Sequence, residues 1–227
     1  MLKRFRSKKP SGAFSAFQHK TASLKELAVH GLNLAASPEN LYGILVSKRF
    51  DPAFREEIMV AIATLNACKY CNYAHHDFAL QAGVSKEELA QLEGIAPEDF
   101  DEEKFLAISY ARELANRNFS GVTPELIKKM KNKYTIEERG DIQTAARIIM
   151  LFSMICNTSD AFLSRLRGEP AEDSNALDEA VVASLFFGSI LPVVGMYLSI
   201  TRRQNPIKTL SDFLNFSESY AERGNAV

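Results

Sequence analysis

The sequence predicts an all-α fold of roughly eight to ten helices joined by short loops. Patterns typical of helix caps, in which a side-chain oxygen binds an otherwise unpaired backbone N–H, recur along the chain. Between these caps the apolar residues are mostly spaced three and four apart, as on one face of a helix. A strand would show alternating β-branched residues, and the sequence has no convincing run of them.

The capping patterns locate individual helices. Serine or threonine with glutamate three residues later is typical of a capping box, and this pair occurs at Ser23–Glu26, Ser85–Glu88 and Thr135–Glu138. Proline directly after a capping residue, where its missing N–H costs nothing, marks further starts at Ser37-Pro38, Asp51-Pro52 and Thr123-Pro124. Gly83 and Gly168 are suitable helix ends, because glycine adopts the left-handed conformation without steric cost.

The composition is that of a folded soluble protein, since 46% of the 227 residues are apolar and 24% are charged. The net charge of −1 gives no electrostatic reason to expect a nucleic-acid partner. We expect three parts: a basic, flexible tail over residues 1–22, a helical domain over 23–168 and a C-terminal helical extension over 169–227. The tail lacks the apolar stretch of a secretory signal, and three cysteines do not suggest a disulfide framework. We therefore expect a cytoplasmic location.

Two of the three cysteines lie close to a histidine. Cys68 and Cys71 are separated by two residues, and His75 follows four residues after Cys71. In a helix each residue advances about 100° around the axis, so Cys71 and His75 both fall within about 60° of Cys68. His76 points about 80° the other way. A dithiol and an imidazole therefore share one helix face, as thiol redox chemistry requires.

The dithiol is expected in the first turn of its helix. Asp51-Pro52 starts one helix, and a short break over 66–68 precedes the next. Unpaired N–H groups at a helix start carry partial positive charge, which favours the nucleophilic thiolate over the thiol. This effect should act most strongly on Cys68. His75 favours Cys71 instead, and it is placed to act as the general base for that thiol.

The spacing of Glu56, then eleven residues, then Cys68-x-x-Cys71-x-x-x-His75 resembles the signature of the alkylhydroperoxidase D-like branch of the carboxymuconolactone decarboxylase family. The resemblance covers roughly residues 40–165 and includes the helix before the motif, Phe54-Arg-Glu-Glu-Ile-Met-Val-Ala-Ile-Ala. His75-His76 resembles the double histidine of the peroxidase-related members. Four matched positions at fixed spacing are much more specific than a lone dithiol.

The resemblance implies an all-α, alkylhydroperoxidase D-like fold, assembly as a homo-oligomer, and thiol-dependent peroxidase or disulfide reductase activity without a cofactor. Carried over to this chain, it makes Cys71 the thiol that attacks a hydroperoxide and Cys68 the thiol that resolves the sulfenic acid into a disulfide. It makes His75 the base and Glu56 the group that orients or charges His75. An external dithiol protein would then reduce the disulfide, which implies an antioxidant role. The resemblance also decides for Cys71 over Cys68 as the attacking thiol.

The chain departs from the family pattern at one position. The best-known members carry a histidine directly before the second cysteine, and this chain has Tyr70 there. With a reference pKa of about 10, a tyrosine does not act as a base at neutral pH. The decarboxylase branch lacks the dithiol, which argues against lactone ring-opening chemistry.

Two other functions stay open. A non-catalytic redox sensor or disulfide-exchange protein would oxidise the same dithiol without turning over peroxide. A zinc module would use both cysteines and His75, with Glu56 or His76 as the fourth ligand, although the chain has no second ligand pair at CxxC spacing. We interpret Cys156 as a buried core residue and Glu57 as a solvated helix charge.

The C-terminal extension contains an uncharged segment of about 21 residues, 180–200, which is long and apolar enough to span a membrane. Pro192 interrupts its middle, and Arg202 and Arg203 follow it. Because basic residues stay on the cytoplasmic side of a membrane, a membrane span here would export the dithiol domain without a visible signal. An oligomer interface, or a helix pair broken at Pro192, would hide the same surface. Membrane contact and buried or oligomeric packing therefore both stay open. A last amphipathic stretch after Asn205-Pro206 is expected to fold back on the body.

Overall fold

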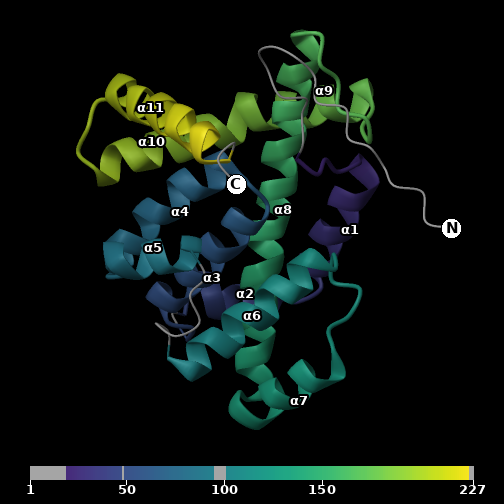
Figure 1. Ribbon diagram of the computed structural model, residues 1–227, viewed down its shortest axis with the longest axis vertical. Helices are drawn as coiled ribbons and strands as arrows, with labels where there is room; N and C mark the ends of the chain where they lie inside the picture. The colour runs from purple at the N-terminus through teal and green to yellow at the C-terminus, as the bar shows by residue number, and fades with distance from the viewer. Residues whose placement is uncertain (1–18, 48, 95–100, 225–227) are drawn as a thin grey trace, which may run out of the picture.

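The computed structural model describes residues 19–47, 49–94 and 101–224. Helix follows helix along these ranges, with no strand among them, which confirms the all-α fold (Figure 1). Of the predicted basic tail over 1–22, residues 1–18 lie outside the described residues. The helices are α1 (Leu24–Ala35), α2 (Pro38–Leu45), α3 (Pro52–Leu65), α4 (Lys69–Ala82), α5 (Lys86–Gly94), α6 (Glu102–Asn116), α7 (Pro124–Lys133), α8 (Ile136–Leu166), α9 (Ala176–Leu185), the π-helix η2 (Phe186–Ile190), α10 (Leu191–Thr201) and α11 (Pro206–Gly224).

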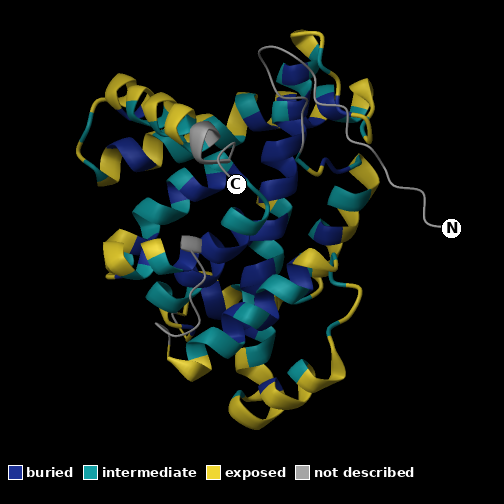
Figure 2. Cartoon of the chain, viewed as in Figure 1, coloured by how far each residue is buried: buried dark blue, intermediate teal, exposed yellow. Residues whose placement is uncertain are grey.

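Two helices form the centre of the molecule. The long helix α8 runs along most of the length of the molecule, and it is surrounded by α1, α2, α3, α6 and α9 (Figure 1). Helix α3 lies in the middle, between α4, α5, α6 and α8. Both central helices are mostly buried, whereas α7 and the outer turns of α10 and α11 are exposed (Figure 2). The site described below lies where α3, α4 and α8 meet.

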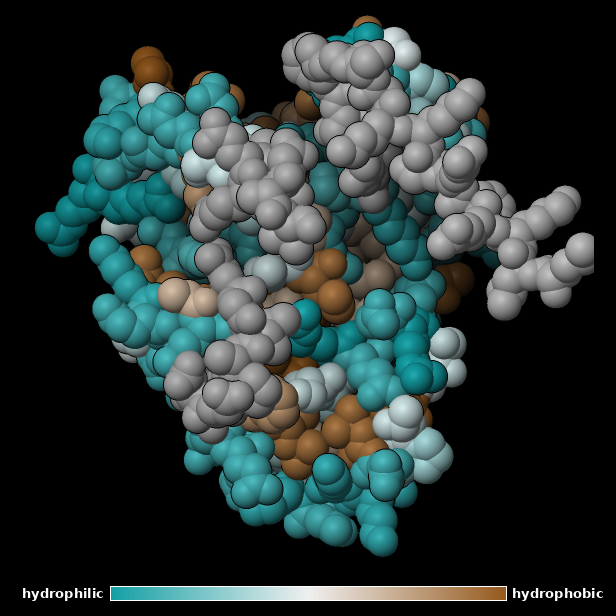
Figure 3. Space-filling view, viewed as in Figure 1, coloured by the Kyte–Doolittle hydropathy of each residue, from teal (hydrophilic) through white to brown (hydrophobic). Residues whose placement is uncertain are grey.

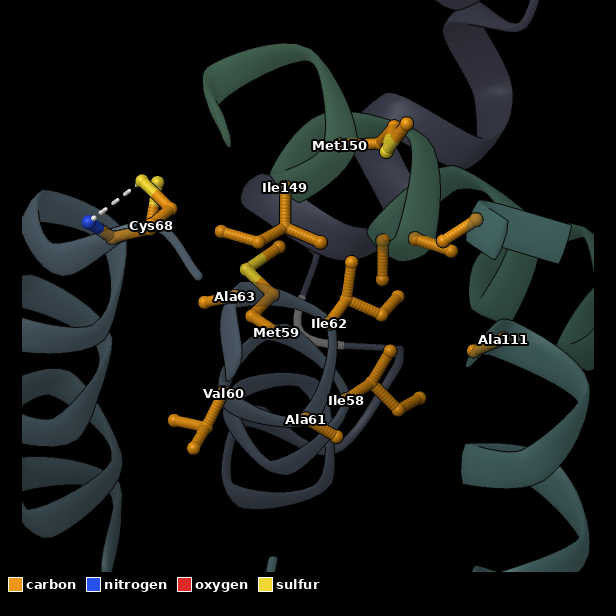
Figure 4. Close-up of a cluster of buried hydrophobic side chains, with 14 of the residues drawn as sticks. Ile58, Met59, Val60, Ala61, Ile62, Ala63, Cys68, Ala111, Ile149 and Met150 are labelled. Carbon is orange, nitrogen blue, oxygen red and sulfur yellow. Dashed lines mark hydrogen bonds between the residues drawn. The ribbon is translucent and has the colours of Figure 1, made fainter. Parts of the chain in front are cut away.

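Helix α3 is buried on all sides because its sequence has no polar face over Ile58–Ala63. In a view along its axis, Val60 points to one side of α3, and Ile58 and Ile62 point toward α6 and α8 (Figure 4). Met59 lies between these two directions (Figure 4). Ile58, Val60 and Ile62 are fully inaccessible to solvent. A helix that is apolar all round is stable only inside a core, so its neighbours are fixed relative to it.

The connection between α3 and α4 is tight and strained. Ala67 has φ +49°, a left-handed conformation that non-glycine residues rarely adopt. The N–H of Cys68 still donates to Ala63 O at 3.0 Å, so the chain turns within three residues. Cys68 then becomes the N-cap of α4, and its sulfur accepts a hydrogen bond from the N–H of Cys71 at 3.3 Å. The predicted break over 66–68 and the predicted place of the dithiol agree with this geometry.

The cap patterns are found in the structure with two exceptions in detail. All three capping boxes form, and Gly83 ends α4 with φ +100°. Pro38 and Pro124 begin α2 and α7 as expected, although the preceding serine and threonine make no side-chain capping bond.

The interpretation of Glu57 as a solvated charge was wrong. Its side chain is buried in α3 and pairs with Lys104 Nζ at 2.9 Å, because the all-round burial of α3 leaves it no solvent face.

The apolar extension is one continuous helix through Pro192, formed by α9, η2 and α10. The hypothesis of a break at Pro192 was therefore wrong. A proline lacks the N–H of the helical ladder and its ring crowds the preceding turn. Here that turn is widened into a π-helix, in which Leu191 N–H donates to Phe186 O five residues earlier. The wider turn accommodates the proline without ending the helix.

The chain then reverses, and α11 folds back along α10 onto α4, as predicted for the last amphipathic stretch (Figure 1). Phe213 of α11 stacks on Tyr70 with ring centroids 5.0 Å apart and meets Tyr73 edge-on. Arg202, at the end of α10, binds Asp77 of α4 at 2.9 Å and lies over the ring of Tyr73. The extension is therefore attached to the helix that carries the dithiol.

Two helices of the described part of the chain are long and apolar enough to cross a membrane, α8 and Ala176–Thr201. The core helix of a soluble protein passes the same test, and 56% of the apolar window of α8 is buried, against 22% in the second helix. Length and composition are therefore weak evidence of a membrane span. The face drawn in Figure 3 is mostly hydrophilic, with hydrophobic side chains gathered near its middle and lower part. Membrane contact and oligomer packing of residues 180–200 both remain predictions.

The strain at Ala67 can be tested by substitution. Ala67→Gly should unfold at the same or a slightly higher urea concentration, because glycine adopts positive φ without steric cost. Ala67→Val should lose about 1–3 kcal/mol of unfolding free energy, because a β-branched residue fits this conformation poorly. The measurement is urea unfolding followed by circular dichroism. Ala90→Gly, at an exposed position inside α5, is the control and should cost about 0.5–1 kcal/mol. If Ala67→Gly lost as much unfolding free energy as Ala90→Gly, the proposed strain at Ala67 would be contradicted.

Candidate active site

Three thiols meet where α4 packs against α8. The sulfurs of Cys68, Cys71 and Cys156 all lie within 4.8 Å of one another, and Cys71 Sγ is 4.0 Å from Cys156 Sγ. All three cysteines are free and buried. Cys156 is buried as the sequence interpretation held, but its position against the dithiol was missed. No local signal could have found it, because it lies 85 residues from Cys71 in an apolar helix.

Among the three sulfurs, that of Cys71 is the best placed to carry negative charge. Burial by itself raises the pKa of Cys71, but hydrogen bonds from Cys156, Cys68 and Ser153 outweigh it and hold the pKa well below its ordinary value. The Ser153 hydroxyl donates to Cys71 Sγ at 3.6 Å. Burial raises the pKa of both Cys68 and Cys156, which keeps them protonated as donors. The arrangement is therefore one thiolate acceptor surrounded by neutral donors.

Glu56 and His75 form a buried acid–imidazole pair. Nδ1 of His75 lies 2.6 Å from Oε2 of Glu56, and Arg55 donates to the other carboxylate oxygen at 2.9 Å. Burial would raise the pKa of Glu56, but the hydrogen bond and charge of His75, together with Arg55, outweigh it and lower the pKa. An ionised carboxylate only accepts hydrogen bonds, so Nδ1 carries the hydrogen toward Glu56. The Nε2 atom is left for proton exchange.

No hydrogen bond joins His75 to a sulfur in the part of the chain that the structure describes. His75 and Cys71 instead line the same cavity, of about 910 Å³, together with Glu56 and Cys156. Cys68 is not part of its wall. A water molecule or a substrate oxygen in this space can relay a proton between imidazole and thiol, which is enough for general base catalysis.

The C-terminal extension supplies much of the cavity wall. Phe186, Ile190 and Leu198 come from the apolar helix, and Thr209 and Phe213 come from α11. The sequence interpretation treated this extension as a part separate from the thiol site. In the structure it covers the face of α4 from which Cys71 is reached. The chamber is mostly apolar, so it suits a substrate with an apolar body.

Tyr70, which replaces the histidine of the best-known family members, is held in the wall by its hydroxyl group. It donates to Asp160 Oδ1 at 2.9 Å, and Lys69 pairs with the other oxygen of the same carboxylate at 2.9 Å. Burial and the charge of Asp160 raise the pKa of Tyr70 far above its ordinary value. Tyr70 is therefore a neutral donor and a packing surface for Phe186 and Phe213.

The comparisons agree with the resemblance in the sequence. Residues 33–112, from the end of α1 into α6, match the model of the carboxymuconolactone decarboxylase family. This part of the chain is similar to that family. The matched segment contains Glu56, Cys68, Cys71 and His75, and it ends before Cys156 and before the extension. The family includes decarboxylases and peroxidase-like enzymes. No curated protein and no solved structure shows a significant match to the chain.

The three sulfurs are also the set among the described residues that is close enough to hold a metal ion. They are soft ligands, of the kind that zinc and copper(I) prefer. A closed zinc site needs a fourth ligand. The expected candidate Glu56 is already engaged by His75 and Arg55.

The donor role of Ser153 can be measured as a pH profile. Ser153→Ala removes one hydrogen bond to the Cys71 thiolate, which should move the midpoint of Cys71 alkylation upward by about one pH unit. Iodoacetamide labelling of Cys71 at a series of pH values, followed by peptide mass spectrometry, gives this midpoint. Ser159→Ala is the matched control, because Ser159 lies on the same helix and donates to Ile155 O instead. An unchanged midpoint in Ser153→Ala would contradict the donor role.

The Glu56–His75 pair should affect how the unfolding free energy depends on pH in acid. A carboxylate with a lowered pKa stabilises the fold fully above its ordinary pKa of 4.5 and loses this contribution as the pH falls through the lowered value. The unfolding free energy of the wild type should therefore fall more steeply below pH 4.5 than that of Glu56→Gln. Glu57→Gln is the control, and its unfolding free energy should still fall steeply below pH 4.5, because burial raises the pKa of Glu57 and Glu56 is still present. Parallel curves for wild type and Glu56→Gln would argue against the pairing.

Proposed function

We propose that this protein is a thiol-dependent peroxidase of the alkylhydroperoxidase-like branch of its family. Cys71 is the attacking thiol, Cys68 resolves the product, and His75 with Glu56 relays the proton. The single observation that supports this best is the shared cavity: it joins the Cys71 sulfur, the most acidic of the three thiols, to the imidazole that Glu56 holds at 2.6 Å. The hydroperoxide and an external dithiol protein are the proposed partners, and a homo-oligomer is the proposed assembly.

The first step forms a sulfenic acid. The proton of Cys71 has passed through a water molecule to His75 Nε2, and Glu56 stabilises the resulting imidazolium, so that Cys71 enters this step as a thiolate. The Cys71 thiolate attacks the distal oxygen of the hydroperoxide, the O–O bond breaks, and two electrons pass from sulfur to the leaving alkoxide. The imidazolium returns its proton to the alkoxide, which leaves as an alcohol.

The second step closes a disulfide and restores the enzyme. The Cys68 thiol attacks the sulfenic sulfur, and the hydroxyl leaves with the thiol proton as water. Cys68 lies three residues before Cys71 and its sulfur is within 4.8 Å of the Cys71 sulfur, so closure requires the two sulfurs to approach to about 2.05 Å. An external dithiol then reduces the disulfide by exchange, with its own sulfurs becoming oxidised.

A disulfide-exchange protein is the second candidate, because the apolar chamber reaches Cys71 and would admit a small dithiol as readily as a peroxide. Such a protein would oxidise and reduce the same pair without any peroxide reaction. A stoichiometric sensor would oxidise once and stop. Repeated consumption of peroxide in the presence of a dithiol separates the peroxidase from both.

The test follows consumption of cumene hydroperoxide with dihydrolipoamide as reductant. Cys71→Ser should lose both turnover and sulfenic acid formation, whereas Cys68→Ser should lose the Cys68–Cys71 disulfide while peroxide still oxidises its Cys71 to the sulfenic acid. His75→Gln should turn over about 10²–10⁴-fold more slowly, and Glu56→Gln should also be slower. His76→Gln is the matched control, since His76 does not line the cavity, and it should remain active.

Two outcomes would count against the peroxidase. Oxidation of the wild type by disulfides and its reduction by dithiols, with Cys71 left unmodified by peroxide, would favour the exchange function. Equal activity of His75→Gln and His76→Gln would remove the proposed proton relay.

A further inference from the structure

We propose that Cys156 is a second disulfide partner of Cys71, so that the site works with three thiols rather than two. The inference deepens the proposed function, and its peroxide step rests on that function. It assigns a redox role to a residue outside the matched family domain, on a different helix from the motif cysteines.

The geometry of the sulfurs carries the inference. Cys71 Sγ and Cys156 Sγ are 4.0 Å apart, at contact distance, and Ser153 one turn earlier on α8 points its hydroxyl at the same Cys71 sulfur. A disulfide requires about 2.05 Å between the sulfurs, so the two side chains must close a gap of about 2 Å. Cys71 lies in the first turn of α4, three residues after the N-cap Cys68 and directly after the strained link at Ala67.

Accessibility distinguishes Cys156 from Cys68. Cys71 and Cys156 both line the apolar cavity and are 5% and 4% exposed, whereas Cys68 does not line it and is fully inaccessible. A reductant that enters the cavity meets only one sulfur of a Cys68–Cys71 disulfide. It meets both sulfurs of a Cys71–Cys156 disulfide. The second pair is therefore the one that an external dithiol can attack at either sulfur.

The chemistry balances in the same way as for Cys68. After a hydroperoxide has oxidised Cys71 to the sulfenic acid, the Cys156 thiol attacks its sulfur, the S–O bond breaks and an S–S bond forms. The hydroxyl and the thiol proton leave as water. An external dithiol then reduces the bond between α4 and α8, and its own sulfurs become a disulfide.

The decisive variant is Cys68→Ser, which retains Cys71 and Cys156 as the only cysteines. It is treated in one arm with cumene hydroperoxide and in the other with diamide, an azo oxidant that couples neighbouring thiols without any peroxidase step. In both arms we expect loss of both alkylatable thiols and a tryptic peptide pair joined through Cys71 and Cys156. Circular dichroism of the treated and untreated variant confirms that the helices are intact.

The double variant Cys68→Ser/Cys156→Ala is the control. With peroxide and dimedone it should be trapped at the sulfenic acid, and with excess peroxide alone it should proceed to the sulfinic acid, which Cys68→Ser should resist. The double variant Cys68→Ser/Cys156→Ser keeps a polar group of similar size at position 156, and the same result with serine shows that the loss of the cross-link follows the thiol rather than the packing.

The outcomes separate the two proposals. A Cys71–Cys156 cross-link with both oxidants supports the inference and the peroxidase together. A cross-link with diamide but no Cys71 oxidation by peroxide supports the thiol pair and contradicts the peroxidase. If Cys68→Ser yields no cross-link with diamide, or accumulates sulfenic acid with Cys156 still alkylatable, the inference is overturned.

Discussion

The all-round burial of α3 is the constraint on which the rest of the structure depends. Its apolar run over Ile58–Ala63 can be stable only when other helices cover every side, and α4, α5, α6 and α8 do so. With α3 and α8 fixed against each other, the left-handed turn at Ala67 sets where α4 begins. The cap of that helix is Cys68, so packing of apolar residues far from any chemistry determines where the thiols lie.

The same burial makes the polar groups of α3 consequential. Glu56 is carried into the core by its helix and would be costly there as an unpaired charge. Arg55 and His75 each bind one of its oxygens, and their attraction is strong enough to keep it ionised. This pairing orients the imidazole and defines its tautomer. Glu57, one residue later, has a single partner in Lys104, and burial raises its pKa, whereas that of Glu56 is lowered. Neighbouring glutamates thus differ because of their partners, not their position in the sequence.

The extension gives the site its enclosure. The π-helical turn before Pro192 lets one helix continue past a proline, and the reversal into α11 then places aromatic rings over Tyr70 and Tyr73. Both motif tyrosines thereby become parts of a wall rather than participants in proton transfer. The cavity between α4, α8 and the extension is mostly apolar, and the Cys71 sulfur and the Glu56–His75 pair are among its polar features. Mostly apolar surroundings of this kind strengthen the electrostatic interactions within them.

The sequence by itself determined the elements and the motif, because caps, apolar spacing and the Cys68–Cys71–His75 face are set within a few residues of each other. It also indicated Glu56, through a fixed spacing that the family shares. Only the tertiary structure decided that Cys156 touches Cys71, that Glu57 is buried, and that the extension forms the wall of the cavity. These are contacts between residues far apart in the chain, and a helix sequence shows which face is apolar but not which distant helix will cover it. The three-thiol site is therefore a product of packing, and the dithiol within it a product of local sequence.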